Sequence, residues 1–183
     1  MSRVRFATAR ALFETFPTTV TKLKVEPTDD APVAFLQNLS AREKFEDAVT
    51  FCAYLLPRRE AVWWACGCAK AFLDEIPPGG AASLRAAEAW VREPNEERRS
   101  RALDVGTQAD SNDGLTWLAL AAGWAGGMLS SNPKAAVPVP QYMTPRAARI
   151  AILLSARGIK ASERSSLMRS RIAEGIKLAE TGL

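Results

Sequence analysis

The sequence predicts a single all-α domain over residues 1–183, a bundle of about eight helices. Apolar residues recur at helical spacing between most of the prolines and glycines, which is the pattern of amphipathic helices. Two stretches, 57–76 and 115–129, carry paired tryptophans and are so apolar that they need neighbours on most sides. A hydrophobic fraction of 48% and a charged fraction of 24% are typical of a globular domain with a full core.

The N-terminal segment 1–30 is predicted to be partly extended. A short helix is expected over residues 7–16, ended by Pro17. Apolar and charged residues then alternate from Val20 to Glu26, which indicates an extended segment lying across the helices. Asp30 is a plausible N-cap for a helix to Leu39.

The middle of the chain holds the predicted central helix. Ser40–Glu43 has the spacing of a capping box for a helix running to about residue 56. Pro57 then begins the central helix, and Pro77–Gly80 ends it near Ile76. Helices over 81–92 and 95–108 follow. The second has a thin apolar face and is expected at the surface, and Trp90 is expected to be the exposed tryptophan.

A second buried helix is predicted over 115–129, capped by Asp113. Its smooth side, containing Gly123 and Gly126, is expected to pack against the central helix. Residues 130–144 form a long proline-rich loop that either packs over helix ends or binds a partner. Thr144 and Ser162 are the expected caps of the last two helices.

Composition argues against catalysis. The chain has no histidine, which removes the commonest general base and the commonest zinc ligand. No pair of carboxylates converges, and Asp110–Gly114 lacks the spacing of a calcium loop. We therefore expect no enzyme, no catalytic, cofactor-binding or metal-binding residues, and no small-molecule cofactor.

The cysteines indicate a cytoplasmic protein. Cys52, Cys66 and Cys68 are odd in number, and Cys66 and Cys68 would point to different sides of a helix. The first residues lack the apolar run of a secretory signal. The charge-free stretch from Gly114 to Pro133 is diluted by glycines and polar residues, so a membrane span is not expected. Reduced, buried thiols are the predicted state.

Charge is unevenly spread. Residues 143–183 hold eight bases and three acids. This end either attracts the acidic middle of the chain or binds an anionic partner. The alternative function that follows is helix-turn-helix-like nucleic-acid binding through the basic C-terminal helices, with Arg169 and Arg171 as its contacts. Any two consecutive helices of a bundle have this outline, so nucleic acid is not the favoured partner.

We predict another protein as the partner, bound through one of two surfaces. Two cations at the start of the central helix oppose its dipole, so they either pair with nearby acids or bind a carboxylate. Tryptophan is enriched in binding hot spots, and apolar residues are abundant in the proline-rich loop. The candidate partner-binding residues are Arg58, Arg59, Trp63, Val137, Val139, Tyr142 and Met143.

Two strings carry a resemblance to a known family. These are LLPRREAVWW at residues 55–64 and LTWLALAAGWAGGM at residues 115–128. Over roughly residues 10–180 the chain resembles a family of small bacterial proteins of unassigned function, associated with type VI secretion gene neighbourhoods. The resemblance implies an adaptor or chaperone-like accessory of a secretion system, and it brings no catalytic residues.

Overall fold

The computed structural model describes residues 4–17, 23–128 and 137–183. These residues form nine α-helices, one short 3-10 helix and no strand, which confirms the all-α prediction. The elements are α1 (Ala9–Thr15), α3 (Pro32–Ala41), α4 (Phe45–Leu55), α5 (Arg58–Phe72), α6 (Pro78–Arg92), α7 (Glu96–Gln108), α8 (Gly114–Gly123), α9 (Met143–Ser155), η2 (Ala156–Gly158) and α10 (Ala161–Thr181).

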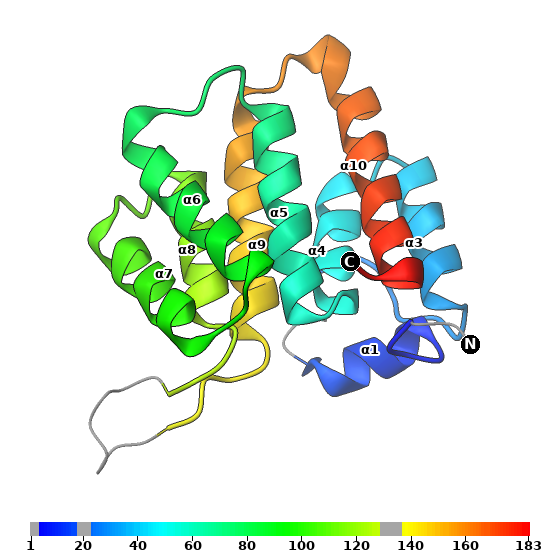
Figure 1. Ribbon diagram of the computed structural model, residues 1–183. Helices are drawn as coiled ribbons and strands as arrows, with labels where there is room; N and C mark the ends of the chain where they lie inside the picture. Colours follow the sequence, from blue (N-terminus) through cyan, green and yellow to red (C-terminus); the bar gives the residue numbers. More distant parts are fainter. Residues whose placement is uncertain (1–3, 18–22, 129–136) are drawn as a thin grey trace.

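Helices α5 and α9 lie side by side at the centre and join two halves of the bundle (Figure 1). On one side α6, α7 and α8 pack together, and on the other α3, α4 and α10 do so. The prediction of a central position is thus confirmed for α5. The second predicted central helix, α8, is buried but belongs to one half, packing mainly against α6, α7 and α9.

Helix α8 is shorter than the prediction, because it ends at Gly123 rather than at residue 129. Its smooth side packs on α7 instead of on the central helix. A Cβ at Gly123 would lie 2.7 Å from the Leu103 Cα, and one at Gly106 would lie 2.9 Å from the Leu120 side chain. The missing side chains let α7 and α8 approach closely, so one face of α7 is buried and only its outer face meets solvent.

Several predicted caps are wrong. Asp30 does not cap α3: its carboxylate accepts a hydrogen bond from the Thr28 hydroxyl, and Ala31 precedes the helix. The capping box at 40–43 is absent because Ser40 is still within α3 and Glu43 turns the chain with φ 58°. Helices α9 and α10 follow Tyr142 and Lys160, not Thr144 and Ser162. The Asp113 cap of α8 is confirmed, with its carboxylate 2.9 Å from the Leu115 N–H.

The core is continuous and holds all three thiols. Trp64 and Trp90 are buried, which corrects the expectation for Trp90, whereas the Trp63 side chain is 37% exposed. Cys52, Cys66 and Cys68 are free and buried, and burial raises the pKa of the Cys66 thiol to about 12. Among the described residues no helix is long and apolar enough to cross a membrane, and no acidic or cysteine cluster could hold a metal ion.

Candidate protein-binding surface

The chain leaves α8 through a tightly held turn, residues 123–127, which we call the anchored turn. Side chains from three different helices donate to three consecutive carbonyls. Arg99 Nη1 lies 2.5 Å from the Gly123 oxygen, Thr144 Oγ1 2.9 Å from the Trp124 oxygen, and Arg58 Nη1 2.8 Å from the Ala125 oxygen. These carbonyls lie at and just beyond the C-terminal end of α8, where a helix leaves its carbonyls without partners, so the three donors satisfy them and fix the path of the chain.

Arg99 is the principal donor of this turn. It is 9% exposed and forms two hydrogen bonds with the Glu96 carboxylate, at 2.8 and 2.5 Å. This contact raises the pKa of Arg99 and lowers the pKa of Glu96. Gly127 has φ +74°, and a Cβ there would lie 2.7 Å from the Arg99 guanidinium carbon. Both facts require glycine at this position.

Beyond the turn two short segments run antiparallel, and we call Met128 and residues 137–139 the stem. Met128 pairs with Pro138 in an isolated bridge, and the Val139 N–H donates to the Gly127 oxygen at 3.1 Å. Figure 1 shows the stem leaving the bundle beyond the ends of α8 and α9. Met128 is 48% and Val137 54% exposed, whereas Val139 is buried at the base. The stem therefore presents apolar side chains outside the core.

The structure divides the residues predicted to bind a partner. Arg58 reaches the anchored turn, so it lies beside the stem. Arg59 instead contacts α6, with its Nε donating to the Val91 oxygen at 2.7 Å. Trp63 is near α10, with the Lys70 ammonium 5.9 Å from its ring centroid. Both arginines thus bond to backbone carbonyls rather than to acids.

The predicted binding residues of the proline-rich loop differ in their exposure to solvent. Val139 is buried, while Tyr142 and Met143 are half-buried where α9 begins, so only Val137 of this group is exposed. Residues 130–136 of the predicted loop lie outside the described residues. Met128 is not among the predicted binding residues, because the predicted helix 115–129 contains it, whereas α8 ends at Gly123. The consecutive glycines before Met128 were the signal that the helix had ended.

The basic C-terminal helices do not pack as a pair. Helix α10 lies against α3, α4 and α5. Arg169 forms an ion pair with Glu43 at 3.1 Å, and Arg171 pairs with Glu174 at 2.7 Å. The two arginines of the nucleic-acid alternative are thus engaged within the chain, and that alternative stays a prediction.

The comparisons with known proteins agree with the resemblance at its coarser level. No curated protein and no solved structure matches the chain. The model of a family of unknown function, DUF6931, matches residues 35–179, a range that contains Arg58, Trp63 and the described residues of the stem. Because that match covers most of the chain, the protein belongs to the DUF6931 family of unknown function.

Proposed function

We propose that this protein is a non-enzymatic, cytoplasmic protein-interaction module that binds its partner through the stem. The observation that carries the proposal is the anchored turn. Three side chains of the bundle fix the base from which Met128 and Val137 emerge. A surface fixed before binding loses less conformational entropy on association, which favours affinity.

The geometry of the stem suggests how a partner would bind. Residues directly opposite in an antiparallel pair share a face, and neighbours along a strand alternate. Met128 is opposite Pro138, so Val137 is directed to the other face of the ribbon. A ribbon with apolar side chains on both faces fits a groove of the partner better than a flat surface.

The resemblance supplies a narrower form of this proposal. In it the protein is an adaptor or chaperone-like accessory of a bacterial secretion system, and the groove belongs to a secreted protein or a type VI component. The buried, uncharged state of the thiols suits a reducing compartment.

Co-purification from the native cell tests the proposal. The full chain and the double variant Met128→Ser, Val137→Ser are compared by quantitative mass spectrometry of bound proteins. We expect at least one protein to be captured by the native chain and lost from the variant, because its two exposed anchors are gone. Leu183→Ser is the matched control, since Leu183 is 49% exposed and outside the stem. Capture that is unchanged in the double variant, with the fold intact, would refute the stem as the binding surface.

Trp63→Ser separates the two predicted surfaces. If the stem alone binds the partner, this variant retains it. Loss with Trp63→Ser and retention with the stem variant would move the binding surface to the region between α5 and α10.

A further inference from the structure

A second surface, independent of the stem, lies where α9 meets α4 and the start of α10. It is a groove of about 340 Å³. Its floor is an aliphatic stripe on α9, formed by Ile150, Leu153 and Leu154, all of them half-buried. Spacings of three and four residues place these side chains on one face of the helix. This stripe therefore remains partly accessible to solvent.

Three arginines rim the stripe. Arg149 and Arg164 are held in place: Arg149 Nε donates to the Thr50 hydroxyl at 2.7 Å, and Arg164 Nη1 donates to the Ala156 oxygen at 3.0 Å. Arg157 is exposed and has no polar partner among the described residues. None of the three forms an ion pair with an acid of the described chain.

The charge balance of the groove is therefore positive. Glu46 is its single acidic lining residue, against the three arginines. The larger groove between α6 and α7, of about 500 Å³, has two acidic lining residues, Glu93 and Glu97, against three arginines. Its floor includes alanines, and its Arg98 is already paired with Glu93. The α9 groove thus joins a floor of three large aliphatic side chains to three arginines that form no ion pair among the described residues.

We propose that the α9 groove binds an acidic amphipathic segment of a partner protein. Its aliphatic side chains cover the stripe of α9, and its carboxylates pair with Arg157 and the neighbouring guanidiniums. Arginine is enriched in protein interfaces, and the fully buried core of an interface is more apolar than the rest of the surface. A nucleic-acid backbone would use the arginines but leave the stripe uncovered, so a protein segment fits the observations better.

Selection of peptides from a random display library on the full-length protein tests this proposal. The selected peptides should carry Glu or Asp beside aliphatic residues. A fluorescein-labelled selected peptide should then bind the native chain and lose affinity about 10-fold in Arg157→Glu and in Ile150→Asp. Arg85→Glu is the matched control, because Arg85 is exposed on α6, has no ion pair among the described residues, and undergoes the same change of charge.

The remaining outcomes each decide the question. Failure to select peptides, selected peptides without acids, or equal affinity for Arg157→Glu and the native chain would overturn the proposal. A labelled DNA duplex that binds the native chain and is released by Arg157→Glu would assign the groove to nucleic acid instead. Self-association abolished by Arg157→Glu would assign it to a second copy of the chain. Circular dichroism checks that the Ile150→Asp variant is folded. If that variant is unfolded, the affinity of Arg157→Glu alone decides the test.

Discussion

Two irregular parts of the chain are held in opposite ways. The described part of the connector between α1 and α3, residues 23–31, is tied to the body at both ends. Leu23 is buried, and the Lys24 N–H donates to the Asp47 carboxylate at 3.2 Å. Among the described residues, the hydrogen bonds that hold the stem lie at its base, in the anchored turn and at the Val139 N–H.

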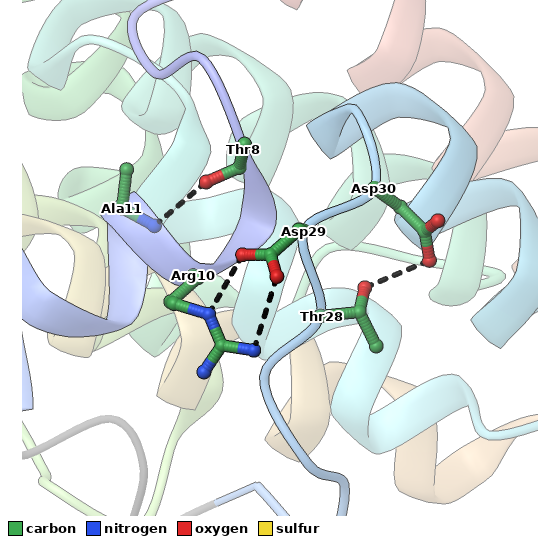
Figure 2. Close-up of polar contacts among 6 residues, drawn as sticks. All are labelled: Thr8, Arg10, Ala11, Thr28, Asp29 and Asp30. Atoms are coloured by element: carbon green, nitrogen blue, oxygen red, sulfur yellow. Dashed lines mark hydrogen bonds and ion pairs between the residues drawn. The ribbon is translucent and has the colours of Figure 1, made fainter.

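Figure 2 shows the polar contacts at the end of the connector. Arg10 Nε lies 2.7 Å from the Asp29 carboxylate, and the Thr28 hydroxyl donates to Asp30 at 2.8 Å. The Arg10 N–H also donates to the Thr28 oxygen at 2.9 Å. Polar groups of the connector thus form hydrogen bonds with α1, whereas the apolar side chains of Met128 and Val137 in the stem are exposed to solvent. The comparison teaches that irregular chain can complete a fold or display a surface, and burial distinguishes the two.

The largest expected difference is between two aliphatic truncations. Leu23→Ala should lower the free energy of unfolding by about 2–3 kcal/mol, because a buried side chain is lost from the connector. Val137→Ala should change it by less than about 0.5 kcal/mol, because Val137 is 54% exposed. Urea unfolding with matched slopes measures both. If the two substitutions lowered the free energy of unfolding equally, the connector and the stem would not differ in their contribution to stability.

A second test concerns the base of the stem. Arg99→Ala should lower the free energy of unfolding by about 2 kcal/mol. The Gly123 carbonyl would lose its donor, and the buried aliphatic part of the arginine side chain would be removed. Arg98→Ala is the matched control on the same helix. Its pair with Glu93 is exposed, so its loss should cost less than about 1 kcal/mol. A smaller effect for Arg99 than for Arg98 would contradict its role as anchor.

A substitution within the anchored turn should have a smaller effect on the free energy of unfolding. Gly127→Ala should cost about 1–2 kcal/mol, because a left-handed φ is strained for alanine and its Cβ meets Arg99. Gly158→Ala has open space and no positive φ, so thermal unfolding should show no loss of stability. If the anchored turn sets the geometry of the stem, Gly127→Ala also weakens partner capture, and Gly158→Ala does not.

The smallest effect belongs to the connector and depends on pH. The hydrogen bond and charge of Arg10 lower the pKa of Asp29 below its ordinary value of 3.8. The stabilisation is therefore present above that ordinary value and is lost as pH falls through the lower pKa of the folded state. Asp29→Asn should have a slightly lower Tm than the native chain near neutral pH and an equal Tm in strong acid. Added salt should also reduce the difference, because both side chains are exposed.

The sequence predicted most of the architecture because helical spacing and proline are local signals. The start of α5 after Pro57 and the turn before Asp113 followed from residues a few positions apart, although α5 ends at Phe72 rather than near Ile76. The helix that packs against the smooth side of α8 could not be predicted in this way. It depends on whether Leu103 of α7 or a residue of α5 packs against Gly123. Pairing across a bundle is not encoded in the periodicity of one helix.

The candidate site was predicted only in outline. Arg58 and Val137 were predicted to bind a partner, but the sequence could not show that Arg58 donates to a carbonyl 67 positions away. Arg99 was not singled out, because an arginine on a charged helix has the sequence signature of a solvated side chain. Its burial arises from the close approach of α7 to the anchored turn, a contact between distant parts of the chain.

The buried thiols have a practical consequence for spectroscopy. Since Cys52, Cys66 and Cys68 are enclosed in the core, a maleimide dye or spin label added to the folded protein should leave them unmodified. A cysteine introduced by Val137→Cys would then be the single reactive position without any native cysteine being removed. Fluorescence or electron paramagnetic resonance at that label would report directly when the ribbon enters a partner.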